Sequence, residues 1–218
     1  MKVKVRAFAI ESENVDLAGI ASISFGDTFF IRSITIMKGK DGKNFVSFPS
    51  LKVGEGYKEV CNPINKEYRQ KLVDAIFTSM EKKECVEFDD GHGSDITVRA
   101  YPCESDGKKV GEAKVYINND FVISGISIYE IYNKQLYPGM PSYKTLDCKP
   151  NGSLIYEPFC SVRKGMQKTL RQIIISEYLQ AKKEQNNERI SIRGKLCESK
   201  DKVADRNGKP CKNEELEK

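Results

Sequence analysis

The cysteines and the single histidine are the residues of this sequence best suited to metal binding or nucleophilic chemistry. The seven cysteines are Cys61, Cys85, Cys103, Cys148, Cys160, Cys197 and Cys211, and the histidine is His92. A structural zinc site usually takes its ligands in closely spaced pairs, and no CxxC pair occurs here. An odd number of cysteines also argues against a complete set of intrachain disulfides. We therefore expect no metal site and no cofactor, and we interpret the thiols as unpaired structural or surface groups.

Acid–base catalysis and phosphate-loop chemistry are equally poorly supported. Asp89 and Asp90 are adjacent carboxylates, but they lie with His92 in a glycine-containing acidic stretch, where the fixed surroundings that catalysis needs are not expected. The glycines at 39–42 and 54–56 are typical of turns, because neither a GxxxxGK[ST] loop nor a GxGxxG motif occurs. The sequence thus predicts no enzyme and no small-molecule substrate.

Clustered basic residues offer a different kind of chemistry, since Lys and Arg side chains can neutralise phosphates. The main cluster lies on one face of a predicted helix in the C-terminal half and comprises Lys164, Lys168, Arg171 and Lys182, extended by Lys183. A predicted helix in the N-terminal half has a weaker set, Lys66, Arg69 and Lys71, interleaved with acidic residues. These residues predict a DNA- or RNA-binding face that the C-terminal half dominates. The alternative is a basic helix face that is merely solvated.

The distribution of charge indicates two modules. Residues 1–83 and 96–185 each carry a net charge of +4, residues 84–95 carry −5, and residues 186–218 carry +2. Two equally basic segments that flank an acidic connector are typical of similar domains joined by a solvated linker.

No apolar run approaches the roughly 20 residues that span a bilayer, and Arg6 and Glu11 interrupt any secretory signal. We therefore expect a cytoplasmic protein with no membrane partner.

An internal repeat supports this division. Five short matches occur in the same order in both halves, at offsets between 92 and 97 residues. They are VRAF at 5–8 and VRAY at 98–101, FFIRSITI at 29–36 and FVISGISI at 121–128, FPS at 48–50 and MPS at 140–142, Pro63 and Pro158, and Gln70-Lys71 and Gln167-Lys168. We infer a tandem duplication, with small insertions in the second copy near residues 143–153.

In each copy, alternating apolar and polar residues predict several strands, and a helical pattern follows them. Asn65 is placed to cap the first helix, whose apolar stripe comprises Tyr68, Leu72, Ala75, Ile76 and Met80. The second helix has the corresponding stripe Met166, Leu170, Ile173, Ile174 and Tyr178 and is expected to run to about Lys183. The predicted fold class is α+β, with two tandem antiparallel β-meanders that each end in a helix.

The expected domain organisation follows from the repeat and the charge pattern. The first copy covers residues 1–83, an acidic linker covers 84–95, and the second copy covers 96–185. Residues 186–218 form a charged tail that we expect to be partly disordered, with one short strand or coil near 190–196.

Several motifs of the first copy resemble one known family. They are FFIRSITIMKG at 29–39, FVSFPS at 45–50, NPIN at 62–65, and the Arg69-Gln70 pair in the helix that follows. In this order and spacing they resemble the SpoVG family (stage V sporulation protein G) over about residues 1–82. The second copy keeps Pro141-Ser142 but has EPFC at 157–160 in place of NPIN, so its membership rests largely on the internal repeat.

The resemblance implies a small β-rich domain that dimerises through its strands, binds DNA and RNA, and acts in sporulation, septation or gene regulation. The family has a basic pair after Pro-Ser, which is reduced here to Leu51-Lys52, so Lys52 joins the candidate nucleic-acid-binding residues. Two linked copies raise each other's effective concentration. We therefore expect an intrachain pseudo-dimer, and further homo-oligomers stay open.

A second reading keeps the fold and changes the function. In it, the protein is a protein-interaction or scaffold module that retains the SpoVG fold without binding nucleic acid. An enzyme is the third reading, and it would need a pocket with convergent polar groups that the sequence does not indicate.

Overall fold

The computed structural model describes residues 1–11, 16–104, 107–149 and 152–207, and side chains are described as far as residue 188 with the further exceptions of 146 and 148. Packing divides the chain into two units, Met1–Tyr178 and Leu179–Lys218. Both predicted copies of the meander thus contribute to one compact unit. The predicted boundaries at residues 83 and 96 stay a prediction.

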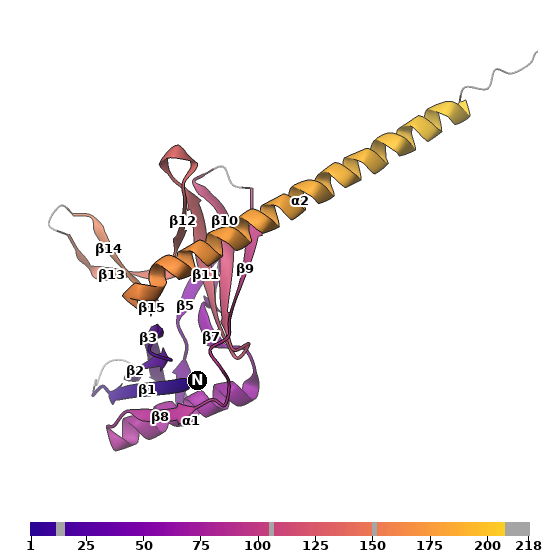
Figure 1. Cartoon of the computed structure of the whole chain (residues 1–218). Helices are drawn as coiled ribbons and strands as arrows, with labels where there is room; N and C mark the ends of the chain where they lie inside the picture. Colours follow the sequence, from indigo (N-terminus) through magenta and orange to yellow (C-terminus); the bar gives the residue numbers. More distant parts are fainter. Residues whose placement is uncertain (12–15, 105–106, 150–151, 208–218) are drawn as a thin grey trace, which may run out of the picture. The chain divides into compact units, whose positions relative to one another are not determined.

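The order of elements in the first half of the chain repeats in the second half (Figure 1). The first half consists of β1 (Lys2–Ala9), β2 (Leu17–Phe25), β3 (Phe29–Lys38), β4 (Asn44–Ser47), β5 (Ser50–Val53), β6 (Gly56–Glu59), β7 (Cys61–Pro63) and α1 (Lys66–Lys82). After β8 (Val86–Asp89), the second half consists of β9 (Ile96–Pro102), β10 (Lys109–Ile117), β11 (Phe121–Glu130), η1 (Tyr132–Lys134), β12 (Leu136–Gly139), β13 (Ser142–Cys148), β14 (Leu154–Pro158), β15 (Cys160–Val162) and α2 (Lys164–Asn207). The α+β class with antiparallel sheets is confirmed, and a helix follows each group of strands.

Along the strands, buried and exposed residues alternate as the sequence predicts, so one face of each sheet is buried and the other is exposed to solvent. On β1, Val3, Val5 and Ala7 are buried, while Lys2 and Arg6 are exposed. The inward face packs against the apolar stripe of α1, in which Tyr68, Leu72, Ala75 and Ile76 are buried and Met80 is partly buried. In the second half, the inward face of β9 to β11 meets Leu170, Ile174 and Tyr178 of α2. One continuous core results.

A side-chain hydrogen bond fixes the start of α1. Asn65 caps the helix, since its side-chain oxygen accepts a hydrogen bond of 2.7 Å from the Tyr68 N–H. The Asn65 amide also donates to the Asp120 carboxylate at 2.8 Å, which links this cap to the turn between β10 and β11. The predicted cap is confirmed, and it has a second role in joining the two halves.

One glycine in each sheet lets a helix lie close to the strands. A Cβ atom at Gly19 of β2 would lie 2.6 Å from the Phe8 carbonyl oxygen and 3.2 Å from the sulfur of Met80 in α1. A Cβ atom at Gly111 of β10 would lie 2.8 Å from the ring of Tyr178 in α2. Gly19 and Gly111 are 92 residues apart, so they occupy corresponding places in the repeated order.

The two halves exchange their shortest strands. β7 of the first half pairs with β11 of the second, and β15 of the second half pairs with β3 of the first. The registers correspond, because Cys61 lies opposite Ile123 in one pair and Cys160 lies opposite Ile31 in the other. Both exchanges are antiparallel, so each sheet is completed by a strand from the other half of the chain.

The acidic connector is more ordered than a solvated linker. Val86–Asp89 forms β8, which pairs with β1 at the edge of the first sheet, because Val86 and Phe88 alternate and pack against the core. Asp90 accepts a hydrogen bond of 2.6 Å from the Met1 ammonium group, and His92 Nε2 lies 3.4 Å from an Asp120 oxygen. The expectation that Asp89, Asp90 and His92 lack fixed partners is therefore wrong.

The C-terminal helix is longer than predicted. The sequence places its end near Lys183 and a short strand or coil near 190–196, whereas α2 continues to Asn207. The residues after Lys183 are rich in Lys, Glu, Gln and Arg, which are good helix formers, and they include no proline before 210. Helix propensity and the absence of a breaker explain the difference.

Candidate functional site

The main predicted basic cluster lies on the first turns of α2. Lys164, Lys168 and Arg171 are all exposed, and their spacing of four and three residues places them on one face of the helix. Leu170 and Ile174 are buried on the neighbouring face of the helix, which fixes the orientation of this segment. The structure therefore brings together the three residues that belong to the Met1–Tyr178 unit.

The other members of that cluster, Lys182 and Lys183, belong to the second unit. Both are exposed residues of α2.

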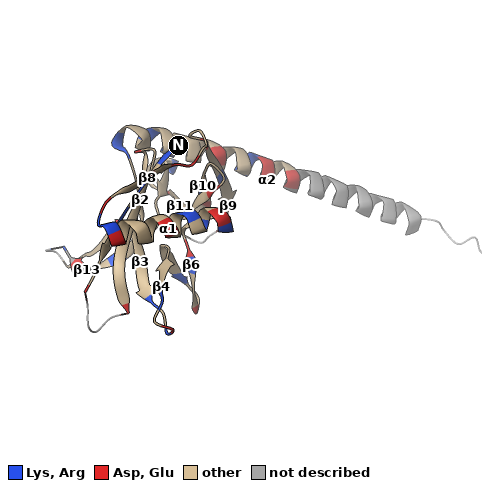
Figure 2. Ribbon diagram, turned by 90° about the horizontal axis from the view of Figure 1, so that it is seen from below, with Lys and Arg blue, Asp and Glu red and all other residues tan. Residues whose placement is uncertain are grey.

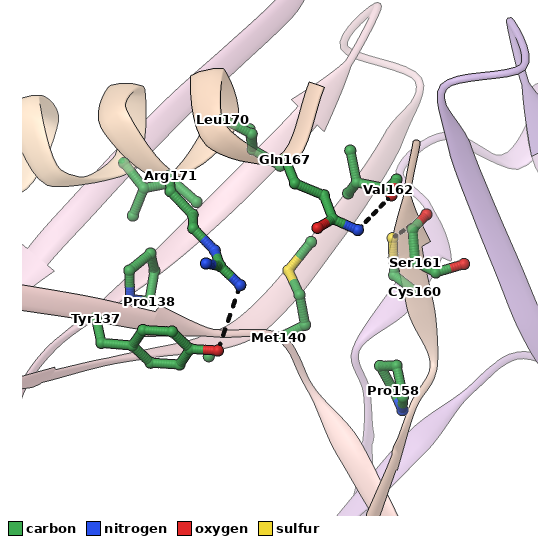
Figure 3. Close-up of a pocket in the computed structure, with 12 residues that line it drawn as sticks. Tyr137, Pro138, Met140, Pro158, Cys160, Ser161, Val162, Gln167, Leu170 and Arg171 are labelled. Atoms are coloured by element: carbon green, nitrogen blue, oxygen red, sulfur yellow. Dashed lines mark hydrogen bonds between the residues drawn. The ribbon is translucent and has the colours of Figure 1, made fainter. Parts of the chain in front are cut away.

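Arg171 also borders a pocket of about 350 Å³ between α2, β12 and β15 (Figure 3). Its guanidinium group lies 5.0 Å from the centre of the Tyr137 ring and donates to the Tyr137 hydroxyl at 3.4 Å. Gln167 donates to the Val162 carbonyl oxygen at 2.9 Å on the other side of the pocket. The remaining walls are largely apolar and include Pro138, Met140, Pro158, Leu170 and Ile174. Stacking on Tyr137 thus holds Arg171 in place at the edge of this pocket.

The basic residues of α1 are less available than the sequence suggests. Arg69 forms an ion pair with Glu59 and lies 4.9 Å from the centre of the Phe48 ring. The Lys71 ammonium group lies 4.6 Å from the centre of the Phe88 ring and donates to the Asp89 carbonyl oxygen at 3.4 Å. These contacts commit both side chains to the first half's own packing.

Lys66 and Lys52 are exposed and lie on elements other than α2. Lys66 lies in the first turn of α1 beside Glu67, and Lys52 lies on the β5–β6 hairpin opposite Tyr57. Figure 2 shows basic and acidic segments mixed along α1. The first-half candidates are therefore divided between α1 and β5, whereas Lys164, Lys168 and Arg171 share one face of one helix.

Sequence reasoning overlooked a second basic surface, on the outward face of the first sheet. Arg6 of β1 and Arg32 of β3 are exposed on this face and line a pocket with the side chains of β2. Arg6 belongs to the repeated VRAF/VRAY match, in which Arg and the aromatic residue alternate with core positions. This alternation could have predicted the surface from the sequence, because the side chains of Arg6 and Phe8 must point away from the core.

The described cysteines have different surroundings. Cys61 and Cys160 are buried, Cys85 and Cys103 are exposed, and all four are free thiols. Burial raises the pKa of the Cys61 thiol to about 12, and burial together with nearby Cys61 raises the pKa of Cys160. A buried protonated thiol is a poor nucleophile, so Cys61 and Cys160 serve the core. Across the described residues, no group of three or more His, Cys, Asp and Glu side chains could hold a metal ion.

Known proteins similar to this chain match its first half. The family model described as SpoVG covers residues 1–82. A protein of Alkaliphilus oremlandii named "Putative septation protein SpoVG" is 38% identical over 81 residues, which are 37% of this chain and 83% of that protein. The protein of the same name from Lachnospira eligens is 34% identical over 86 residues, which are 39% of this chain and 93% of that protein. The chain belongs to the SpoVG family.

The SpoVG match ends at Lys82, the last residue of α1. A SpoVG protein of Clostridium beijerinckii, 35% identical over 81 residues, likewise covers 37% of this chain and 85% of its own length. No solved structure matches the chain. The relatives are named as septation proteins and not as enzymes. Among the described residues, no helix is both long enough and apolar enough to cross a membrane.

Proposed function

We propose that this SpoVG-family protein is a non-enzymatic cytoplasmic regulator of septation, sporulation or gene expression that binds DNA or RNA through the basic row of α2. The septation role is suggested by the names of the relatives. The observation that carries the binding proposal is the exposed row Lys164, Lys168 and Arg171, which makes no ion pair with any carboxylate in the described part of the chain. Such a row is available to phosphates.

The dimensions of the row suit a nucleic-acid backbone. Arg171 lies seven positions after Lys164 in the helix, and a rise of 1.5 Å per residue gives a span of about 10 Å. This span corresponds to about three phosphates along one strand of a duplex. Each neutralised phosphate releases condensed counterions, so three contacts make binding strongly dependent on salt.

We also propose that the two halves are copies of one domain that pair within the chain as a pseudo-dimer. The repeated order of elements and the reciprocal pairing of β7 with β11 and of β15 with β3 support this arrangement. A single chain in solution would have a mass near 24.7 kDa. A measured mass of that size supports intrachain pairing, whereas a mass twice as large means that the chains associate further.

The binding proposal can be tested by charge removal. We compare the wild type with K164Q/K168Q/R171Q and with the control K38Q/K40Q/K43Q, which removes three exposed charges from the β3–β4 hairpin. Gel shifts and fluorescence anisotropy use single-stranded and duplex probes between about 50 and 200 mM salt. The α2 variant is expected to lower affinity by tenfold or more and to reduce the salt slope by about 2 to 3. The control variant should stay close to the wild type.

The alternative is a protein-interaction module. It is favoured by the first half, where Arg69 is paired with Glu59 and Lys71 with the β8 backbone, so that the charges of α1 are largely occupied. If the wild type binds no probe even near 50 mM salt, the interaction module is supported and the nucleic-acid proposal fails.

A further inference from the structure

The outward face of the first sheet has an ordered grid of side chains. Cross-strand register places Arg6 of β1 opposite Ser22 of β2, and places Lys4 opposite Ser24. Ser24 in turn lies opposite Phe30 of β3. Lys4, Ser24 and Phe30 thus form one row across three neighbouring strands.

A β-bulge adds the second arginine to this face. The register between β2 and β3 shifts between Ala21 and Ile23, so that Ser22 lies opposite Arg32 and Ser33 together. Ser33 has a φ of +59°, and Ile31 and Ile34 on either side are fully buried. The bulge therefore turns Arg32 outward while its neighbours remain in the core.

Arg6, Ser22 and Arg32 form the second row of the grid. Adjacent strands are about 4.8 Å apart, so the backbones of the two arginines are about 10 Å apart with Ser22 between them. Arginine side chains are long enough to converge on one anion above the serine. Two guanidinium groups around a hydroxyl group are a suitable arrangement for a phosphate.

These rows line a pocket of about 240 Å³ that has cationic and hydroxyl groups and no carboxylate in its lining. Two acidic side chains near Lys4 have cationic partners, because Asp27 pairs with Lys4 itself at 3.1 Å and Glu87 pairs with Lys2 at 3.0 Å. Arg6 and Arg32 are exposed and form no ion pair with any described residue. Their positive charge is therefore unbalanced.

Ser24 provides an independent sign of a missing partner. Its Oγ atom is buried in the lining of this pocket and has no hydrogen-bond partner. Buried hydroxyl groups in folded proteins are nearly always hydrogen-bonded, and an exception requires an explanation. An anion held by the neighbouring arginines would supply an acceptor for the Ser24 hydroxyl.

We propose that this pocket binds a phosphate of single-stranded nucleic acid, with Arg6 and Arg32 on either side of it and Ser22 and Ser24 as hydrogen-bond donors. Single-stranded binding sites combine basic grooves with aromatic side chains on which bases stack. Phe8 is 54% exposed on the same face, and the Arg6 guanidinium carbon lies 5.6 Å from its ring centre. This inference rests on the proposed function and assigns the sheet as a second contact besides α2.

The second sheet offers a matched comparison. Arg99 of β9 corresponds to Arg6 in the repeat and lies opposite Lys114 of β10. The residue that corresponds to Arg32 is Ser124, which is buried and lies within hydrogen-bond distance of the Val60 carbonyl oxygen. The second face therefore lacks the pair of facing arginines. Replacing Arg99 should affect binding less than replacing Arg6 and Arg32.

The test measures binding of a single-stranded oligonucleotide to R6Q/R32Q, to R99Q and to the charge-matched control K38Q/K43Q. R6Q/R32Q should bind at least tenfold more weakly, with a salt slope smaller by about 1 to 2, while the control retains the affinity of the wild type. Because both arginines are exposed, the variants should keep the circular dichroism and melting temperature of the wild type. R6K/R32K should recover part of the affinity, since charge is retained without the guanidinium geometry.

Three results would overturn the inference in distinguishable ways. If R6Q/R32Q binds as the wild type does while K164Q/K168Q/R171Q is impaired, the sheet site is wrong and the proposed function stands. If the wild type binds no oligonucleotide, both fail. A titration with inorganic phosphate, followed by NMR of the arginine Nε–H signals, separates a further case. Shifts of Arg6 and Arg32 in a protein that binds no oligonucleotide would assign the pocket to free phosphate instead.

Discussion

The guanidinium group of Arg69 meets the carboxylate of Glu59 through two nitrogen–oxygen contacts of 3.2 and 2.5 Å. The pair joins α1 to β6, and the guanidinium group also lies over the ring of Phe48. A bidentate pair of this kind fixes the angle between two elements as well as neutralising charge. Arg69, which the sequence suggested as a nucleic-acid contact, is thus placed where it holds the first half together.

Replacing Arg69 should therefore affect stability more than binding. Both side chains are about one third exposed, so we expect R69A to lower the free energy of unfolding by about 1 kcal/mol, with the affinity for oligonucleotides unchanged. Urea unfolding and the anisotropy assay measure the two quantities. R69K keeps the positive charge but loses the contact of two guanidinium nitrogens with Glu59, so its free energy of unfolding should fall nearly as much. If R69A is as stable as the wild type but binds oligonucleotides much more weakly, Arg69 contacts nucleic acid and this prediction is wrong.

The bulge in β3 gives a second prediction. Ser33 has a φ of +59°, whereas the corresponding residue of β11 is Gly125, with a φ of +72°. Left-handed backbone is strained for serine and not for glycine. S33G should therefore raise the free energy of unfolding by up to about 1 kcal/mol, and G125S should lower it by more than that.

G125S should also be destabilising for a steric reason. A Cβ atom at Gly125 would lie 3.3 Å from a methyl group of Val60. Thermal unfolding of the two variants checks both signs. Equal destabilisation by S33G and G125S would contradict the view that the two bulges share one backbone conformation.

The approach of α2 to the second sheet can be tested at Gly111. A Cβ atom there would lie 2.8 Å from the Tyr178 ring and 3.0 Å from the backbone oxygen of Tyr101, so G111A should lower the free energy of unfolding by about 1 to 3 kcal/mol. Gly165 is the matched control, because it lies in α2 with no atom within 4 Å of an added Cβ. G165A should be neutral or stabilising by up to about 1 kcal/mol. Chemical unfolding compares the two, and equal effects would show that Tyr178 moves away freely.

Much of this fold could be predicted from local patterns. Alternation on β1, the apolar stripe of α1 and the Asn65 cap depend on neighbouring residues, and all three are confirmed. The exchange of β7 and β15 could not be predicted in this way, because each strand has only three residues and its partner lies in the other half of the chain. Its sequence signal is the internal repeat, from which we infer two copies, and the repeat does not indicate how the copies would pair.

The candidate site could likewise be predicted only where it depends on neighbouring residues of one element. Helical spacing correctly groups Lys164, Lys168 and Arg171 on one face. The occupation of Arg69 by Glu59 and the grouping of Arg6 with Arg32 depend on which strands are neighbours. Spacing within one element predicts a face, whereas partners across elements require the register of the sheet.

The two buried thiols provide a prediction about pH. Burial raises the pKa of Cys61 from 9.0 to about 12, and the pKa of Cys160 is raised for the same reason, so the folded protein keeps both protons above pH 9. The unfolded chain releases them there and so binds fewer protons than the folded one. Stability must consequently fall as pH rises above 9, by up to about 1.4 kcal/mol per pH unit for each thiol.

The substitution C61S/C160S removes both ionisable groups and nearly preserves their size. We expect this variant to be less stable at neutral pH, because two hydroxyl groups enter the core, but to lose less stability between pH 8 and 10. C85S is the control, since it removes an exposed thiol and leaves the buried pair in place. Urea unfolding at closely spaced pH values gives the three slopes. If all three proteins have the same slope, the thiols ionise alike in the folded and unfolded states, and Cys61 and Cys160 are not held protonated in the core.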